Sequence, residues 1–217
     1  MRFLTKLKKH FQANKADFFL IIVYVVFILG TYEFFNRPFG QVRNLEIPLD
    51  DKIPFVKELI LVYHTYFPLV IACLALASMH SKRLFHQLLA SLLFAQVAAY
   101  VIYVNFQTYV PRYDVSKLGN DFFSWAVKYT YSIDNSYSGA PSLHVCDMFI
   151  SAWFFSKMNF SKGVKVWGIL YMTLAAATTD LVKQHVILDV PAGLAHGILS
   201  CLIVAFVFKK LSKSSSQ

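Results

Sequence analysis

The stretch APSLHVCDMFISAWFFSK (residues 140–157) places a proline, a serine and a histidine directly before an apolar run. A second stretch, KQHVILD (residues 183–189), leads in the same way into the apolar run 188–208. An ionisable side chain close to the core of a bilayer is costly, so it is by default a candidate for a functional site. His144 and His185 are therefore the first residues of interest in this chain.

The composition indicates a membrane protein. Of the 217 residues, 57% are hydrophobic and only 15% are charged, whereas soluble domains carry about 25% charged residues. Crossing a bilayer takes about 20 mostly apolar residues. Six runs approach this length: 17–35, 58–79, 84–106, 142–157, 164–181 and 188–208. We therefore predict an all-α integral membrane protein with six transmembrane helices.

These runs form one predicted membrane domain, residues 17–208, between a basic segment (residues 1–16) and a basic, serine-rich tail (residues 209–217). The basic segment followed by an apolar run is similar to a signal peptide. The first run is longer than the apolar core of such a peptide, and no Ala-x-Ala-like cleavage site follows it. We expect it to remain as the first span.

The distribution of basic residues predicts the orientation, because Lys and Arg concentrate in short cytoplasmic loops and tails. With both termini in the cytoplasm, the cytoplasmic side holds 13 of the 21 basic residues: Arg2, Lys6, Lys8, Lys9, Lys15, Lys82, Arg83, Lys157, Lys162, Lys165, Lys209, Lys210 and Lys213. The net charge of +9 then faces anionic lipid. We expect no nucleic-acid partner, because no basic aromatic groove or binding motif accompanies the charge.

Two long segments fall on the predicted outer side, residues 36–57 and 107–141. The second contains Phe122, Phe123 and Trp125 among polar neighbours, so we expect an interfacial helix at the level of the lipid headgroups. Two hypotheses for this helix stay open: it rests on the membrane, or it acts as a lid that guides a substrate.

The same topology brings the polar motif residues together. Those at the predicted outer ends of spans three to six are Arg112, Ser142, His144, Lys183, His185 and Asp189. Unrelated polar residues would rarely all fall at one membrane face. We therefore expect an active site on the outer face of a cell membrane.

These residue types suit cleavage of a phosphate ester, which requires a nucleophile, an acid for the leaving oxygen, and donors for the phosphate oxygens. His185 and Asp189 lie four residues apart and would share a helical face, so the carboxylate can orient the imidazole as in a Ser-His-Asp triad. His144 follows Pro141 at the start of a span and can supply a proton.

The phosphate oxygens would be held by a second set of groups. Ser142 and the first free N–H groups of its helix form an anion site, and Arg112 and Lys183 add positive charge. Asp147, three residues beyond His144, can orient that imidazole, and a role in the helix dipole explains it equally well.

The motifs resemble those of the type 2 phosphatidic acid phosphatases, a family that includes inositol phosphoceramide synthase-like phosphotransferases. The second family motif, Pro-Ser-Gly-His, is similar to Pro-Ser-Leu-His at residues 141–144, and the leucine resembles the synthase-like branch. The third motif keeps His185 and Asp189 but has Thr-Thr at residues 178–179 in place of Ser-Arg. The first motif is absent in its usual form, and residues 107–112, which end in Pro-Arg, resemble its counterpart in that branch.

The resemblance implies that His185 is the nucleophile and forms a phosphohistidine, that Asp189 orients it, and that His144 is the general acid. The implied phosphate-binding residues are Arg112, Ser142 and Lys183, where Lys183 replaces the charge of the missing arginine. The implied enzyme acts on a phosphorylated lipid and needs no cofactor. Hydrolysis by water is favoured, because the short chain offers little obvious acceptor pocket; transfer of the phosphorylated headgroup to a lipid or polyol hydroxyl is the alternative.

Two further classes stay open. His144 with Asp147 and His185 with Asp189 could ligate a metal, although Arg112 and Lys183 would repel a cation, so we expect no metal. A catalytically silent, lipid-binding member of the family is the other alternative. The oligomeric state and the particular lipid are not predicted; phosphatidic acid, phosphatidylglycerol phosphate and polyprenyl pyrophosphate are the substrates considered.

Overall fold

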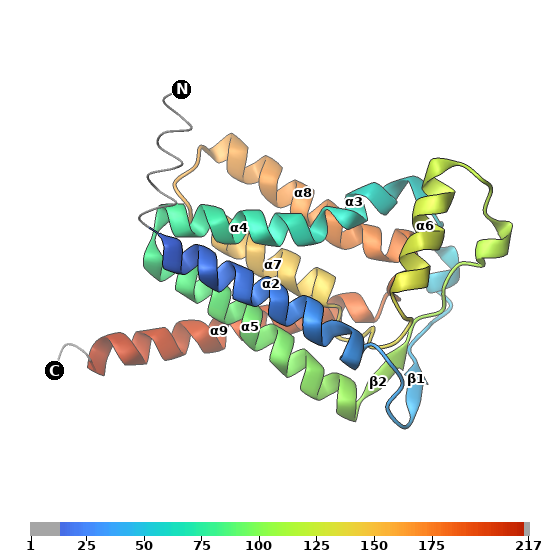
Figure 1. Ribbon diagram of the computed structural model, residues 1–217, viewed down its shortest axis with the longest axis horizontal. Coiled ribbons are helices and arrows are strands. Elements are labelled where there is room, and N and C mark those ends of the chain that lie inside the picture. The colour runs from blue at the N-terminus through green and yellow to red at the C-terminus, as the bar shows by residue number, and fades with distance from the viewer. Residues whose placement is uncertain (1–13, 215–217) are drawn as a thin grey trace.

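The computed structural model describes residues 14–214, so most of the predicted segment 1–16 and the end of the predicted tail 209–217 lie outside it. The chain forms a bundle of long helices with a layer of short elements at one end (Figure 1). The long elements are α2 (Lys15–Phe35), α4 (Tyr66–His80), α5 (Lys82–Asn105), α7 (Leu143–Ser156), α8 (Lys162–Leu181) and α9 (Asp189–Ser214). The described part of the predicted tail continues α9.

The short elements come from the two long connecting segments. They are β1 (Val42–Asn44), η1 (Asp50–Lys52), η2 (Lys57–Leu59), α3 (Ile60–His64), β2 (Gln107–Tyr109), η3 (Val115–Lys117) and α6 (Phe122–Ile133). Strands β1 and β2 pair in parallel, with Val42 opposite Gln107. The prediction of an all-α protein is therefore correct for the bundle and misses this small sheet.

Polar residues at the ends of the apolar runs set the helix boundaries. Ser81, Ser142 and Ser161 each accept a hydrogen bond from the backbone N–H three residues on, and so cap α5, α7 and α8. A side-chain oxygen at this position satisfies a donor that the first helical turn leaves without a partner.

The described residues include four helical segments long and apolar enough to cross a membrane: Lys15–Phe35, Lys57–His80, Lys82–Asn105 and Asp189–Ser214. This finding supports an integral membrane protein. α7 is apolar but has only 14 residues, and α8 is long enough but not apolar enough to be counted. Six spans therefore stay a prediction.

α7 is the central helix of the bundle and packs against α4, α5, α8 and α9 (Figure 1). Its side chains Cys146, Ile150 and Ser151 are fully buried. Because α7 is surrounded by other helices, its apolar sequence is explained by protein packing as well as by lipid. The first turn of α7 carries His144. This packing places it centrally, at the end of the bundle where the short elements lie.

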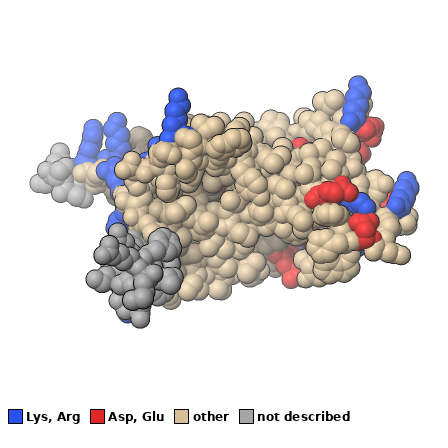
Figure 2. Space-filling view, turned by 90° about the horizontal axis from the view of Figure 1, so that it is seen from above, with Lys and Arg blue, Asp and Glu red and all other residues tan. Residues whose placement is uncertain are grey.

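The two ends of the bundle differ in charge. α2 begins and α9 ends at one end of the molecule, opposite α6 and the strands (Figure 1). In Figure 2, basic side chains lie at both ends, whereas the visible acidic side chains lie only in the half that carries α6. This arrangement agrees with the sequence pattern from which a cytoplasmic location of both termini is predicted.

α6 is the helix expected in the segment 107–141, and it lies across the ends of the long helices (Figure 1). Phe122, Trp125, Tyr129 and Ile133 are exposed and follow one another at helical spacing. The rings of Phe122 and Trp125 stack at 6.0 Å, and those of Trp125 and Tyr129 at 5.7 Å. Such an aromatic surface suits the headgroup region of a bilayer.

Candidate functional site

His185 lies in the loop between α8 and α9, and Asp189 is the first residue of α9. His185 Nδ1 is 3.0 Å from Asp189 Oδ2, and the backbone N–H of Val186 donates to the same oxygen. The two side chains therefore meet, but across a turn and not along a helical face as predicted. The reason is that α8 ends at Leu181, so the four-residue spacing is spanned by a loop.

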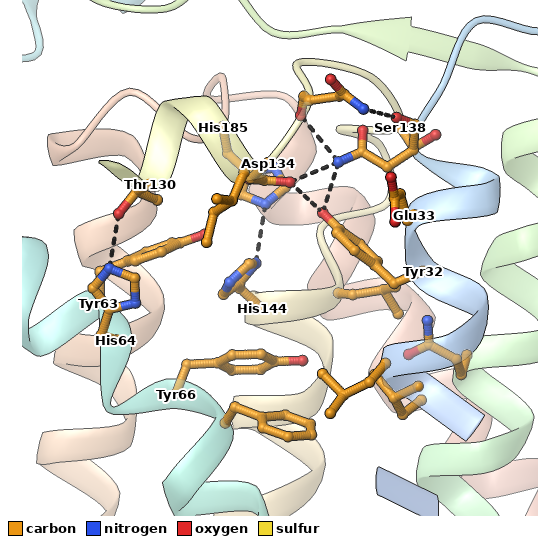
Figure 3. A pocket seen from close by; sticks show the side chains of 18 of the residues that line it. Tyr32, Glu33, Tyr63, His64, Tyr66, Thr130, Asp134, Ser138, His144 and His185 are labelled. Atoms are coloured by element: carbon orange, nitrogen blue, oxygen red, sulfur yellow. Dashed lines mark hydrogen bonds between the residues drawn. The ribbon is translucent and has the colours of Figure 1, made fainter. Parts of the chain in front are cut away.

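His144 occupies the first turn of α7 and faces His185. Its Nδ1 lies 3.4 Å from His185 Nε2 (Figure 3). This is long for a hydrogen bond, so another group can readily replace His185 as the partner of His144. The ring of His144 lies between the rings of Tyr63 and Tyr66, with centroids at 4.8 and 4.2 Å.

Asp147 does not contact the imidazole of His144. Its Oδ2 accepts a hydrogen bond of 2.7 Å from the hydroxyl of Tyr66, one of the two tyrosines that enclose the ring. The prediction that Asp147 orients His144 directly therefore needs correction. The side chain is buried inside the bundle, and its nearest effect on His144 passes through the position of Tyr66.

Ser142 connects the two histidine motifs. Its Oγ caps α7 by accepting from the N–H of Val145, and its own N–H donates to the backbone oxygen of Asp189 at 3.3 Å. Gly193, one turn into α9, has no side chain, and a Cβ there would collide with the backbone oxygen of Ser142. α9 and the start of α7 are thus in direct backbone contact, which fixes the spacing of the histidines.

Arg112 reaches the histidines from the segment that follows β2. Its Nη2 forms an ion pair of 3.1 Å with Asp134 Oδ2 and donates to the backbone oxygen of Asn135 at 2.8 Å. The guanidinium lies over the ring of Tyr131. Its Nε and Nη1 are buried and have no hydrogen-bond partner among residues 14–214. These are the donors that a bound anion would use.

Lys183 is directed away from the histidines. Its Nζ donates to the backbone oxygens of Asp50 and Ile53, both at 2.9 Å. Lys183 has a positive φ of 52°, so the chain reverses here and directs this side chain toward η1. Its contacts therefore give no support to the prediction that Lys183 binds phosphate, because the ammonium group is already engaged by two carbonyls.

The segment around η1 forms hydrogen bonds with the loop that carries His185. The sequence did not predict this contact. Asp50 accepts hydrogen bonds from the N–H of Ile187 at 2.7 Å and from the N–H of Ile47 at 2.9 Å. The hydroxyl of Tyr131 donates to the oxygen of Val182 at 2.7 Å. The only sequence signal was a cluster of charge in the segment 36–57, which does not reveal a contact between residues 137 positions apart.

Two cavities adjoin the histidine pair. A small polar one is lined by Arg112, Gln184, His144 and His185. A larger cavity of about 420 Å³ is lined by both histidines and by side chains from α2, α4 and α6 (Figure 3). Its apolar lining includes Ile28, Leu29, Phe67 and Ile133, and its polar lining includes Tyr32, Glu33, His64 and Asp134.

A hydrogen-bond network joins the small cavity to the end of α2. Asp134 Oδ1 accepts from the amide of Asn36 at 2.6 Å and from the hydroxyl of Tyr32 at 3.1 Å, while its Oδ2 faces Arg112. Asp134 and Asn36 are contributors that sequence reasoning missed, because neither belongs to a motif. No group of three or more His, Cys, Asp or Glu side chains that could hold a metal ion occurs within residues 14–214.

The site therefore belongs to a helical membrane protein with a carboxylate-supported histidine beside a second histidine and an arginine. The family model of the PAP2 superfamily matches residues 44–203. The chain belongs to this superfamily, and membership supports a function of the phosphatase or phosphotransferase type. No curated protein and no solved structure matched the chain.

Proposed function

We propose that this protein is a metal-independent phosphatase that hydrolyses a phosphorylated lipid at the outer face of a membrane, through a phosphohistidine at His185. The observation that carries the proposal is the contact of Asp189 with His185 Nδ1, with Nε2 directed at His144. A carboxylate on one imidazole nitrogen fixes the tautomer in which the other nitrogen has a free lone pair.

In the first step, His185 Nε2 attacks phosphorus, an N–P bond forms, and the P–O bond to the lipid alcohol or leaving phosphate breaks. His144 donates the proton that the leaving oxygen takes up. In the second step, water attacks phosphorus, the N–P bond breaks, and His144 accepts a proton from that water. Arg112 supports the proposal because its unpartnered Nε and Nη1 can hold phosphate oxygens as negative charge shifts among them.

The larger cavity supports a lipid substrate. It joins apolar side chains of α2 and α4 to both histidines, so a tail can remain in an apolar environment while the phosphate reaches His185. The volume of about 420 Å³ accommodates the part of a lipid nearest its phosphate. Phosphatidic acid, phosphatidylglycerol phosphate and polyprenyl pyrophosphate are the substrates we propose to test.

Transfer to an acceptor hydroxyl is a second candidate function. The lining of the larger cavity includes Asp134, with Glu33 and the His64–Thr130 pair on opposite sides of the histidines (Figure 3). These groups can hold hydroxyls of a polyol or lipid acceptor, which would replace water in the second step. The first step is identical in both functions.

The deciding experiment incubates purified protein in a chelator with the three phosphorylated lipids, with and without diacylglycerol or inositol. Hydrolysis predicts free phosphate. Transfer predicts phosphate in a new lipid or headgroup species that appears only with the acceptor. Absence of both products across the panel would contradict the proposal and favour a lipid-binding role.

Substitution of the histidines tests their separate roles. We expect His185→Ala to lower turnover by on the order of 10⁴-fold or more and His144→Ala by roughly 10²-fold to 10⁴-fold. After quenching with base, a labelled phosphoprotein should accumulate in His144→Ala and be absent in His185→Ala. His86→Ala is the control, since His86 is exposed on α5 and bonds only its own helix at Lys82. Full activity of His185→Ala would contradict the assignment.

A further inference from the structure

The side chains that the sequence predicted to bind phosphate in this part of the chain do not contact the histidine pair. Thr178 and Thr179 occupy the positions where the related motif has Ser-Arg, and their hydroxyls donate to Ala175 and Ala176 of their own helix. Lys183, the expected replacement for the arginine, bonds two carbonyls near η1. Neither position therefore supplies a donor to the histidine pair.

Gln184 lies between Lys183 and His185 in the sequence, and its surroundings differ from those of the lysine. Its side chain is only 4% exposed and lines the small polar cavity together with Arg112, His144 and His185. The amide Nε2 is buried and has no hydrogen-bond partner within residues 14–214. Leaving a buried amide donor without an acceptor costs about 1–3 kcal/mol, so a group that accepts its hydrogen bonds would bind favourably there.

The backbone holds Gln184 in place. Its N–H donates to the oxygen of Thr179 at 2.8 Å, which closes the end of α8. The positive φ of Lys183 allows the chain to reverse between the two side chains. The direction of the Gln184 side chain is therefore set by the same turn that brings His185 to Asp189, and not by contacts of the amide itself.

Arg112, which lines the same cavity, offers a second observation. Its side chain is 10% exposed, and its Nε and Nη1 also have no acceptor among the described residues. Its charge is offset by Asp134 at 3.1 Å. The lining of this small cavity thus includes two residues with unpartnered N–H donors, one paired cation and one neutral amide, together with both histidines.

We infer that Gln184 is a phosphate-binding residue, which donates from its amide to an oxygen of the phosphoryl group while Arg112 donates to another. This inference rests on the proposed function for its substrate and extends it by a residue that no motif includes. The phosphate is then held by a guanidinium and a neutral amide, while Lys183 stabilises the loop through its bonds to Asp50 and Ile53. The amide contributes hydrogen bonds without adding positive charge to the site.

The test measures binding of inorganic phosphate and of orthovanadate to the purified full-length protein, from the rise of its thermal unfolding midpoint with anion concentration. Gln184→Met keeps the size of the side chain and removes both N–H donors. We expect its Kd for phosphate to rise about 10-fold to 100-fold, the effect of one hydrogen bond to a charged group. Gln184→Glu should bind phosphate more weakly still, because it adds a negative charge.

Gln96→Met is the matched control. Gln96 is another buried glutamine whose Nε2 has no partner in the described chain, but it lines the larger cavity and not the small one beside Arg112. We expect the Kd for phosphate to be unchanged in this variant. The midpoint without anion reports whether each variant is folded, and if Gln184→Met does not fold, Gln184→Glu carries the same test.

The outcomes separate this inference from the proposed function, because anion binding needs no turnover. Phosphate binding that depends on Gln184 in a protein with no lipid product would contradict the proposed reaction and support the binding role. The inference is overturned if the Gln184 variants bind phosphate as tightly as the unchanged protein while Arg112→Met loses binding. It is also overturned if the unchanged protein binds neither anion.

Discussion

Nε2 of His185 and Nδ1 of His144 lie 3.4 Å apart, yet the two rings are held differently. Hydrogen bonds fix His185, whereas His144 packs against two tyrosine rings. His185 is bound at Nδ1 by a fully buried carboxylate, in a loop clamped by Asp50. His144 is in contact with the rings of Tyr63 and Tyr66, and no carboxylate bonds its imidazole in the described chain. The difference matches what each residue must do: a nucleophile presents one lone pair in one direction, and a general acid must release and regain its proton.

The carboxylate of His185 offers the strongest test of this comparison. Asp189→Asn keeps the shape of the side chain, but the amide can donate to Nδ1 and move the imidazole proton to Nε2. We expect kcat to fall on the order of 10⁴-fold, the effect of such a change in a triad, with a smaller change in KM. Steady-state kinetics on the best lipid would show this, and nearly unchanged kcat would contradict the orienting role.

Gly139→Ala would shift the position of the Asp189 carboxylate without changing its chemistry. A Cβ at residue 139 would lie 2.7 Å from Asp189 Oδ2 and 2.6 Å from a methyl carbon of Val110, so one of these must move. A misplacement of about 1 Å can cost about 10²-fold in rate, and we expect a loss of this order in kcat.

Gly163→Ala is the control for this substitution, because nothing lies within 4 Å of a Cβ built there. The two variants make the same chemical change in different surroundings. Equal activity of both would show that the position of Asp189 tolerates the added methyl group.

Lys183→Met tests whether this residue supports the His185 loop or binds phosphate. The substitution leaves the carbonyls of Asp50 and Ile53 without their donor, and we expect a loss of about 1–3 kcal/mol in the stability of this region. The thermal unfolding midpoint should fall, while the Kd for inorganic phosphate changes less than in Arg112→Met. A weaker phosphate affinity at an unchanged midpoint would instead favour the original expectation from the sequence.

Asp147→Asn should have the smallest effect and completes the comparison. The asparagine oxygen can still accept the hydrogen bond from Tyr66, so the ring that lies against His144 keeps its position. We expect turnover close to that of the unchanged protein, in contrast to Asp189→Asn. A loss as large as that of Asp189→Asn would show that His144 also depends on a carboxylate.

The sequence was most informative where a feature is local. The apolar runs predicted the long helices, although α7 is explained as much by its central position as by lipid. The motif at residues 141–144 and the pair His185 and Asp189 predicted two clusters that the structure places in contact. Such local features are predictable because capping and short spacings act within a few residues.

The missed features depend on contacts between distant segments. The choice between Lys183 and Gln184 as the residue that faces the histidines is made by one positive φ and two carbonyls from residues 50 and 53. Asp134 belongs to no motif, and its contact with Arg112 arises only once α6 is folded. Spacing along the chain contains neither piece of information.

The clamp of Asp50 on Ile187 also bears on the order in which the site is made. Asp50 leaves the ribosome early, whereas Ile187 lies two residues before α9, the last described helix, so their hydrogen bond joins segments 137 residues apart. Contacts of such long range form late, because the loop between them must first be closed. A growing chain that contains His144 but lacks α9 therefore has no completed site, and we expect competence for phosphate chemistry to arise only when the last helix docks.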